Sequence, residues 1–414
     1  MNVVFVAYED LRGAGVIHAY NFACEIARMG DRVLFLMPGL RESVGVMDRA
    51  PGFEIGILRF DHAILVPSLR ARIAAFSPDI VHVWTPRNIP ARAALEIRLR
   101  TGARIVIHYE DDEEFVYNQQ FPPDPLFRAR YTIKTLGFPR PGEPHPHLWF
   151  WKNPLISALA NRAAASFTAL SPALRDSLAA RWSKRIDVLY PGVDLDKFHP
   201  GAAPAPVRER FGLSGRKLVV YSGSVALYHD FDILLRAIAI VVRKDPSVCL
   251  LQFGRFAWTE ERTQALINEL GIRDHVVLGG EVPHREIPAH LAAADVLVHP
   301  ARFNDFNTYR LPSKIPEYLA MGKPAVISQA GIGAEFRDRV EVLKTRTEDP
   351  AELAGKITEL LGDEALRDAL GKGARLAAER LFNLEANALQ LRGIYRSVCP
   401  GKKPAAPARG GPTR

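Results

Sequence analysis

The stretch RLPSKIPEYLAMGKPAV, residues 310–326, reads as a short helix that a glycine closes and that continues at once into an apolar strand. Ser313 stands at the expected N-cap, and Pro316 is tolerated because the first helical turn needs no N–H there. Gly322 suits the left-handed residue that follows a helix. A helix that passes directly into a strand is the repeating unit of α/β proteins, and the same unit recurs before this stretch.

Short β-branched runs alternate with helical patterns along most of the 414 residues. Strands are predicted at 2–8, 31–37, 79–84, 103–109, 166–170, 185–192, 217–223, 248–254, 275–280, 295–300 and 324–328. Single helices between successive strands imply parallel pairing and doubly wound sheets. We therefore predict two tandem Rossmann-like α/β domains that face each other across a cleft, where ligands of such sheets bind.

Composition shifts set the predicted domain limits. The pattern lapses between residues 194 and 218, so we expect an N-terminal domain over 1–195 and a C-terminal domain over 196–398, whose last helix is free to cross back. Residues 115–150 are rich in proline and aromatics and read as an insertion. Residues 399–414 lack an apolar pattern and are expected to form a disordered tail.

The overall composition is that of a globular protein, with 48% hydrophobic and 24% charged residues. No run reaches the roughly 18 apolar residues of a membrane span. The first residues lack the layout of a secretory signal. Cys24, Cys249 and Cys399 have no metal-binding or redox spacing. We expect reduced thiols in a cytoplasmic protein.

The net charge of +8 raises the question of a polyanionic partner. Part of it lies in the tail, where four cations (Lys402, Lys403, Arg409 and Arg414) face no acid. No basic stripe with interleaved aromatics is present, which argues against nucleic acid. Weak attraction to an anionic membrane surface stays open, which would make the protein peripheral on the inner membrane face.

Cations and a carboxylate gather at the start of the helix quoted above. Lys314 lies in its first turn, Arg310 lies just before it, and Glu317 lies one position further in. A helix start with two cations suits a diphosphate, and a carboxylate there suits the vicinal hydroxyls of a ribose. The alternative is that Glu317 only complements the helix dipole and that Lys314 is solvated.

Five segments resemble, in order, the motifs of the GT-B glycosyltransferases of the large retaining family four. They are PDIVHVW (78–84), VLYPGVDLDKF (188–198), KLVVYSGSVALYHDFDILLRAIAIV (217–241), VVLGGEVPHREIPAHLAAADVLVHP (276–300) and PSKIPEYLAMGKPAV (312–326). The resemblance covers nearly the whole chain. It implies a GT-B fold, with the donor bound mainly by the second domain and the acceptor by the first.

The resemblance also assigns residues. Glu317 takes the place of the glutamate that holds the donor ribose, and Val282 and Pro283 take the place of the backbone that brackets the base. His108 matches a histidine that approaches the reacting sugar, although a histidine there also fits core packing. Neither a cofactor nor a metal is implied.

The chain departs from the family at the diphosphate. Ser224 and His229 stand where an arginine and a lysine are common, and Tyr309 stands where a glutamate contacts the donor sugar. Asp305 is a candidate substitute for that glutamate. The nearest replacements for the cations are Arg310, Lys314 and Arg255, with hydrogen bonds from Ser224 and the backbone after Gly223.

Two further stretches carry candidate residues. Gly13 and Gly15 follow the first strand, and they fit either a loop near the donor phosphates or a plain strand-to-helix turn. The acidic run HYEDDEEF (108–115) fits either a solvated face or, through Glu110 or Asp111, recognition of an acceptor hydroxyl. We expect no metal at the Asp111–Asp112 pair, because the resembled family generally needs none.

The sequence thus predicts a glycosyltransferase that moves a sugar from a UDP-sugar or GDP-sugar to an acceptor hydroxyl with retention. The acceptor would be a carbohydrate or lipid-linked molecule, in polysaccharide or glycoconjugate biosynthesis. One alternative is an inactive homologue that binds a nucleotide sugar or a glycosyltransferase partner, which the departures at 224, 229 and 309 motivate. A second alternative is a sugar-nucleotide epimerase of the same fold.

Overall fold

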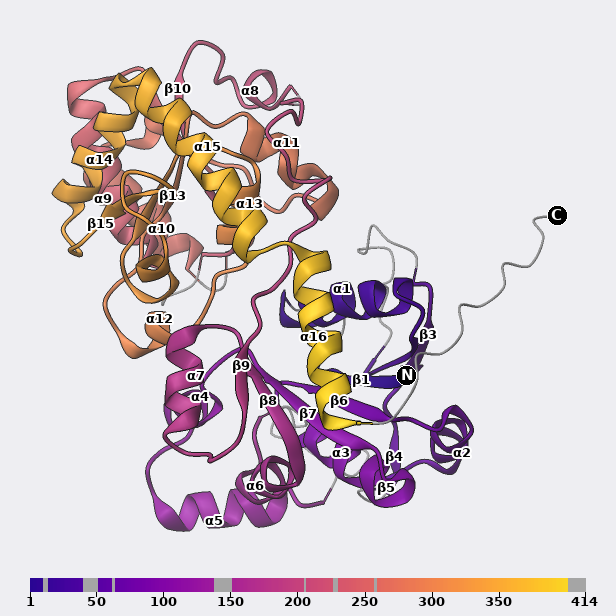
Figure 1. Cartoon of the computed structure of the whole chain (residues 1–414). Helices are drawn as coiled ribbons and strands as arrows, with labels where there is room; N and C mark the ends of the chain where they lie inside the picture. The colour runs from indigo at the N-terminus through magenta and orange to yellow at the C-terminus, as the bar shows by residue number, and fades with distance from the viewer. Residues whose placement is uncertain are drawn as a thin grey trace. The chain divides into compact units, whose positions relative to one another are not determined.

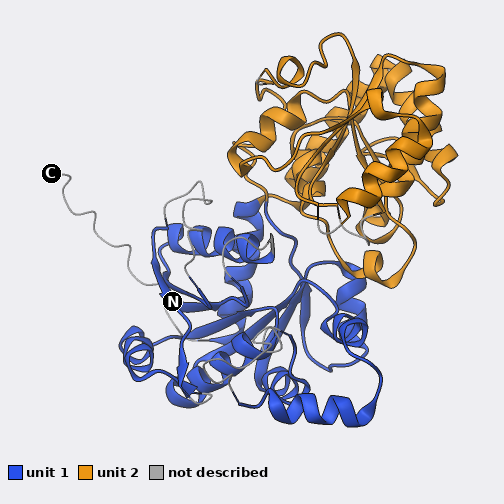
Figure 2. Cartoon of the chain, turned by 180° about the vertical axis from the view of Figure 1, so that it is seen from behind, with its two compact units in different colours: residues 1–192, 384–414 blue, residues 193–383 orange. Residues whose placement is uncertain are grey.

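The computed structural model describes residues 1–9, 14–39, 51–61, 64–137, 151–204, 206–225, 230–256 and 259–400. The chain divides into two compact units, drawn in blue and orange in Figure 2. Unit 1 comprises Met1–Gly192 and Leu384–Arg414, and unit 2 comprises Val193–Asn383. The division lies close to the predicted one at 195, and the last helix is part of unit 1.

Unit 1 is built on a parallel sheet whose strands run in the order β3-β2-β1-β6-β7-β8-β9 (Figure 1). The strands are β1 (Asn2–Val6), β2 (Arg32–Met37), β3 (Glu54–Ile57), β6 (Ile80–Trp84), β7 (Arg104–Tyr109), β8 (Ala164–Ala169) and β9 (Ile186–Val188). A separate antiparallel pair is formed by β4 (Phe60–Asp61) and β5 (Ile64–Leu65). The strand order reverses between β1 and β6, so the carboxyl ends of these two strands mark the expected ligand position.

The helices of unit 1 are α1 (Ala14–Arg28), α2 (Pro67–Phe76), α3 (Asn88–Thr101), α4 (Glu113–Gln120), α5 (Pro125–Lys134), α6 (Pro154–Ala163), α7 (Pro172–Ala179) and α16 (Leu384–Val398). The predicted insertion therefore contains α5 and most of α4, whereas its last part, 138–150, lies outside the described residues. Asp112 and Asp124 start these two helices, because each side chain accepts a backbone N–H of the first turn.

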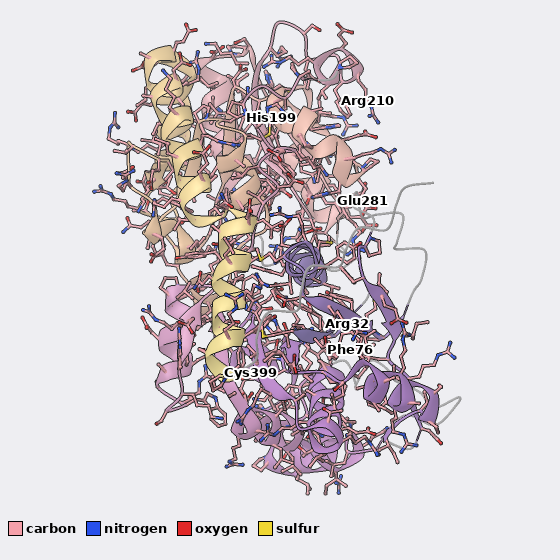
Figure 3. The ribbon with its side chains drawn as sticks, turned by 45° about the vertical axis from the view of Figure 1, so that its right-hand side comes forward. Arg32, Phe76, His199, Arg210, Glu281 and Cys399 are labelled. Carbon is pink, nitrogen blue, oxygen red and sulfur yellow. The ribbon has the colours of Figure 1, made fainter. Side chains whose placement is uncertain are left out.

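The C-terminal helix α16 completes the core of unit 1. Leu384, Ala388, Leu391 and Tyr395 recur at helical spacing and are buried together with residues of α1, β1 and β2. Arg392 adds an ion pair, its Nε lying 2.7 Å from Asp31 Oδ2. The Arg32 guanidinium, next in the chain to Asp31, lies 4.9 Å from the centre of the Phe76 ring, and Figure 3 labels both residues.

Unit 2 is built on a second parallel sheet, with the order β12-β11-β10-β13-β14-β15. Its strands are β10 (Lys217–Ser222), β11 (Val248–Phe253), β12 (Val276–Leu278), β13 (Val296–His299), β14 (Ala325–Ser328) and β15 (Leu343–Thr345). β10 is buried except at its first residue and reads as a continuous apolar run, as expected for a strand covered on both faces. The order reverses between β10 and β13, which is the second position where a ligand is expected.

The helices of unit 2 are α8 (Val207–Arg210), α9 (Phe231–Lys244), α10 (Glu260–Leu270), α11 (Ile287–Ala292), α12 (Asp305–Tyr309), α13 (Lys314–Ala320), α14 (Pro350–Gly362) and α15 (Glu364–Leu381). Short 3-10 turns are η3 (Arg273–His275), η4 (His284–Glu286) and η5 (Gly331–Glu335). Across the described parts of both units, no helix combines the length and the apolar character that crossing a membrane requires.

Candidate functional site

The carboxyl end of β10 meets the first residue of α13. Gly223, which follows β10, has a φ of +111°, and a Cβ on it would lie 2.9 Å from Lys314 Cε. Only glycine fits this position without displacing the lysine. The hydroxyl of Tyr318 also holds α13 against β10, because it accepts the backbone N–H of Ser222 at 2.7 Å. The chain therefore brings the predicted Gly223 and Lys314 together.

Helix α13 begins and ends largely as the sequence predicts. Ser313 occupies the N-cap position, but its side chain makes no capping hydrogen bond because its backbone is already helical. Pro316 lies in the first turn, and Gly322 adopts a φ of +60° beyond the last turn. The helix has only 7 residues, so side-chain cations rather than the helix dipole must carry an anion site here.

Lys314 is half-buried, and its Nζ lies 3.7 Å from the centre of the Tyr221 ring. Burial lowers the pKa of Lys314 well below its usual value, and the Arg310 guanidinium lowers it further. Among the described carboxylates only Glu317 contributes in the opposite direction, and Glu317 is paired with His284 instead. The Tyr221 hydroxyl is also buried without a hydrogen-bond partner. A cation and a hydroxyl in this state suit an anionic ligand.

Arg310 is held beside Lys314 by its own contacts. Its Nε donates to Asn307 Oδ1 at 3.2 Å, and its guanidinium lies 4.3 Å from the centre of the Phe306 ring. The charge of Arg310 also acts on Tyr221, whose pKa burial raises and Arg310 lowers. Two cations therefore converge on the end of β10.

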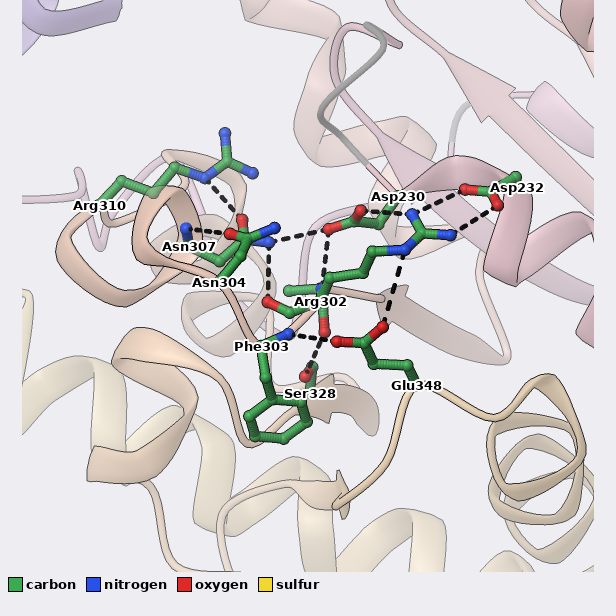
Figure 4. A network of polar contacts seen from close by, with 10 residues as sticks. Asp230, Asp232, Arg302, Phe303, Asn304, Asn307, Arg310, Ser328 and Glu348 are labelled. Carbon is green, nitrogen blue, oxygen red and sulfur yellow. Dashed lines mark hydrogen bonds and ion pairs between the residues drawn. The ribbon is translucent and has the colours of Figure 1, made fainter. Parts of the chain in front are cut away.

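A polar network fixes Asn307 in turn (Figure 4). The Asn307 amide donates to Asp230 Oδ2 at 2.8 Å and to the Arg302 carbonyl at 3.0 Å. Arg302 donates through Nη1 to Asp230 Oδ1 at 2.6 Å and through Nη2 to Asp232 Oδ2 at 2.8 Å. The start of α9 and the loop after β13 thus position Arg310 through one side chain, Asn307.

Glu317 lies next to the segment predicted to bracket a base. Val282 is half-buried and Pro283 is exposed, and they lead into His284, whose Nε2 lies 3.4 Å from Glu317 Oε1. Glu281, which precedes this segment, is labelled in Figure 3. The side chain of Glu317 keeps 15% of its surface exposed, so it remains reachable for a ligand. Lys197 joins from the other side, with its Nζ 2.9 Å from His284 Nδ1.

The remaining predicted residues of unit 2 are exposed or half-buried, or lie outside the described residues. Arg255 is exposed after β11, and Asp305 is exposed at the first position of α12. Tyr309 and Ser224 are half-buried. His229, like Gly13 of unit 1, lies outside the described residues.

In unit 1, a carboxylate stands at the ends of β6 and β7. Glu110 Oε1 accepts from Trp84 Nε1 at 2.9 Å and lies 2.9 Å from His18 Nδ1. A Cβ on Gly15 would lie 2.0 Å from Glu110 Oε2, so the glycine is needed where α1 begins. The start of α1 therefore lies next to the Glu110 carboxyl group, and the predicted role of Gly15 in a loop near the donor phosphates stays a prediction.

His108 is not at this surface. It has no exposed area, its ring stacks on Trp84 at 4.0 Å between centres, and its Nδ1 lies 2.8 Å from Thr168 Oγ1. Burial lowers the pKa of His108 well below its usual value, and His82 and His18 lower it further. The packing of His108 fits the core alternative, and its predicted approach to the reacting sugar stays a prediction. Glu110 and His18 are the paired polar side chains at this edge.

The acidic run is likewise not a solvated face. Glu110, Asp112 and Glu113 are buried, and among the acids of the run only Glu114 is exposed. Glu113 lies 3.2 Å from the buried Arg87, and Asp112 accepts backbone N–H groups at the start of α4. Among the described residues, no cluster of His, Cys, Asp or Glu is arranged to hold a metal ion.

Sequence reasoning missed Lys197, His284, His18 and Asn307. Two of them, Lys197 and His284, lie inside or beside segments quoted for the family motifs. The signal that was present is the position of Lys197 in a turn and of His284 directly after a proline. Their mutual contacts join residues far apart in the chain and could not be read from spacing.

Comparison with known proteins gives two family matches. Residues 15–197 match the family described as "Glycosyltransferase Family 4", and residues 216–363 match "Glycosyl transferases group 1". The two matches fall largely on unit 1 and on unit 2 respectively.

Curated relatives match parts of the chain. A GDP-mannose-dependent alpha-(1-6)-phosphatidylinositol monomannoside mannosyltransferase of Mycolicibacterium smegmatis is 34% identical over 36% of this chain and 40% of its own length. A D-inositol 3-phosphate glycosyltransferase of Frankia alni is 32% identical over 54% of this chain and 55% of its own length. The chain spans about half the length of the curated relatives it matches.

Solved structures match nearly the whole chain. Anabaena HepE in complex with UDP has a TM-score of 0.72 and 18% identity, covering 96% of this chain and 100% of that one. Sucrose-phosphate synthase from Thermosynechococcus elongatus has a TM-score of 0.71 and 18% identity, covering 97% and 100%. At this identity the likeness is one of fold.

Proposed function

Because this chain belongs to the family 4 and group 1 glycosyltransferases and has the GT-B fold, we propose that it transfers a sugar from a nucleotide-diphosphate sugar to an acceptor hydroxyl. The observation that carries the proposal is the state of Lys314. This half-buried lysine stands at the strand-order reversal of unit 2, its pKa is lowered, and Glu317, the carboxylate that acts on it, is engaged by His284. A diphosphate would supply the missing negative charge.

The donor occupies the end of the unit 2 sheet. Lys314 and Arg310 bind the diphosphate, Glu317 accepts hydrogen bonds from the ribose hydroxyls, and the backbone at 282–283 brackets the base. The base is that of UDP or GDP. The UDP complex of HepE and the GDP-mannose-dependent mycobacterial relative support these two classes.

Catalysis then consists of positioning and of stabilising the departing diphosphate, with retention at the anomeric carbon. Arg310 and Lys314 take over the role of the cations that Ser224 and His229 do not provide. One such contact contributes roughly 3–4 kcal/mol, or ~10²–10³ in rate, in comparable sites. Asp305 is the proposed contact to the donor sugar, because it is exposed at the start of α12 in the same loop as Arg310.

The acceptor hydroxyl meets unit 1 at Glu110. The carboxylate is oriented by His18 and Trp84, and it stands at the carboxyl end of β7 beside the strand-order reversal. The acceptor is a carbohydrate or a lipid-linked molecule of polysaccharide or glycoconjugate synthesis. The phosphatidylinositol monomannoside in the name of one relative supports this class.

The experiment is to incubate the full-length protein with UDP-sugars and GDP-sugars and mixed acceptors, and to measure released UDP and GDP. We expect release with one donor and its loss in Lys314→Met. Tight donor binding without release, under every acceptor condition, would instead identify an inactive binding protein. Interconversion of the donor sugar without transfer would identify an epimerase.

We further propose that unit 1 attaches peripherally to an anionic membrane surface through α5. Buried Tyr131 anchors this helix, while Leu126 and Ile133, 58% and 69% exposed, lie on its opposite face. Arg130 and Lys134 are exposed on the same helix, which contains no acid. A helix whose solvent-exposed face carries apolar side chains next to cations has the pattern of an interfacial helix.

Flotation with phosphatidylglycerol and phosphatidylcholine vesicles tests this attachment. We expect the wild type to float with the anionic vesicles only, and the double variant Leu126→Ser, Ile133→Ser to remain unbound. Leu389→Ser is the matched control, because this leucine of α16 is 53% exposed outside α5. Binding that is equal in the double variant and the wild type would remove α5 from the proposal.

A further inference from the structure

Three side chains from separate segments of unit 2 meet in a row beside the proposed ribose position. Lys197 Nζ lies 2.9 Å from His284 Nδ1, and His284 Nε2 lies 3.4 Å from Glu317 Oε1. Lys197 comes from the turn after β9, His284 from η4 and Glu317 from α13. Of the three side chains, His284 is the one that contacts both Lys197 and Glu317.

The lysine determines which nitrogen of His284 carries the proton. A protonated lysine ammonium offers donors and no acceptor, so Nδ1 of the imidazole must accept from it. In the neutral ring the remaining hydrogen is then on Nε2, which faces the Glu317 carboxylate. The opposite tautomer would turn a lone pair toward the carboxylate and weaken the contact.

Lys197 and His284 both stand on restrained backbone. Lys197 belongs to a turn in which Asp194 Oδ1 accepts the backbone N–H groups of residues 196 and 197 at 3.1 and 3.2 Å. His284 follows Pro283, and the Phe198 ring lies 5.8 Å from its centre. The imidazole therefore has a defined position from which to hold a carboxylate.

We propose that His284 is a positioning residue that orients the Glu317 carboxylate for the donor ribose, in the tautomer that Lys197 imposes. The inference rests on the proposed function, since it concerns the same site. A carboxylate held at Oε1 keeps further lone pairs for two vicinal hydroxyls. His284 itself need not touch the nucleotide, which sets its effect apart from that of Glu317.

The experiment compares UDP and GDP with their 2′,3′-dideoxy analogues by calorimetry on the full chain. We expect His284→Ala to lower the affinity for the nucleotide with an intact ribose about 2–10-fold. The affinity for the dideoxy nucleotide should not change. His284→Gln should restore most of the loss, because its amide can donate toward Glu317. Lys197→Met should weaken the ribose form in the same direction.

His199→Ala is the control, because His199 lies in the neighbouring turn, where its Nδ1 accepts the Gly201 backbone N–H at 3.1 Å. If the wild type does not prefer the ribose form of either nucleotide, the ribose site of the proposed function fails. If Glu317→Ala abolishes the preference while His284→Ala retains it, the positioning role alone is overturned. Equal weakening of both forms by His284→Ala would also overturn it.

Discussion

Replacing Lys314 by methionine removes the charge from the proposed diphosphate site and keeps the length of the side chain. The Nζ atom lies 3.7 Å from the Tyr221 ring centre and next to Gly223, in surroundings that methionine fits without a new polar group. The fold of unit 2 should therefore persist. The variant isolates the interaction of the ammonium with an anion.

The expected loss follows from the value of a charge-assisted hydrogen bond, about 1.5–3 kcal/mol, which corresponds to a Kd increase of ~10–150-fold. The loss should appear for UDP or GDP and be absent for uridine or guanosine, which lack the phosphates. Isothermal titration calorimetry of all four ligands measures it. Lys356→Met, a substitution on α14 where Nζ lies 3.6 Å from Glu359, is the control.

The dependence on pH gives a second readout of the same substitution. Burial and Arg310 lower the pKa of Lys314 in the free protein, and a bound diphosphate would raise it again. Between the pKa of Lys314 in the free protein and the usual value of 10.5, the lysine must take up a proton when the diphosphate binds. The affinity for the nucleotide therefore falls as the pH rises through this window. Lys314→Met should remove this fall. Equal losses for nucleotides and nucleosides, or an identical pH slope in the variant, would refute the phosphate role.

Three further outcomes are expected. Burial lowers the pKa of His82 to about 3 from 6.5, so below about pH 6.5 the unfolded state binds a proton that the folded state excludes. Urea denaturation of unit 1 should show a stability loss of about 1.4 kcal/mol between pH 7.5 and 5.5 that His82→Gln lacks; equal slopes would contradict this. Gly15→Ala should displace Glu110 and reduce acceptor turnover while donor affinity stays constant, and unchanged transfer kinetics would argue against this edge. Asn307→Ala should free Arg310 and weaken UDP or GDP binding about 2–10-fold in calorimetry, whereas wild-type affinity would exclude the positioning network.

The central strands could be predicted because most of their residues are β-branched or otherwise apolar. β6 and β10 are covered on both faces, and their sequences IVHVW and KLVVYS read as strands without any alternation. The edge strands β3 and β15 were not predicted. They have only four and three residues, and the polar residues Glu54 and Lys344 interrupt their apolar pattern.

The donor-side residues could be predicted where they are contiguous in sequence. Lys314 and Glu317 lie in one helical turn, so the chemistry of the motif fixed their common position. Lys197 and His284 are 87 residues apart, and only the fold brings them together. The burial of His108 could not be predicted, because a buried run does not reveal where the strand leaves the core.

The account depends most on the contact between Glu317 and the ribose, which a double-mutant cycle between protein and ligand measures directly. Affinities of UDP or GDP and of the matching 2′,3′-dideoxy nucleotide are determined for the wild type and for Glu317→Ala. We predict that removing both the carboxylate and the hydroxyls reduces the binding free energy no more than removing either one alone. Losses that simply add would show that Glu317 and the ribose do not touch, and the proposed donor site would be wrong.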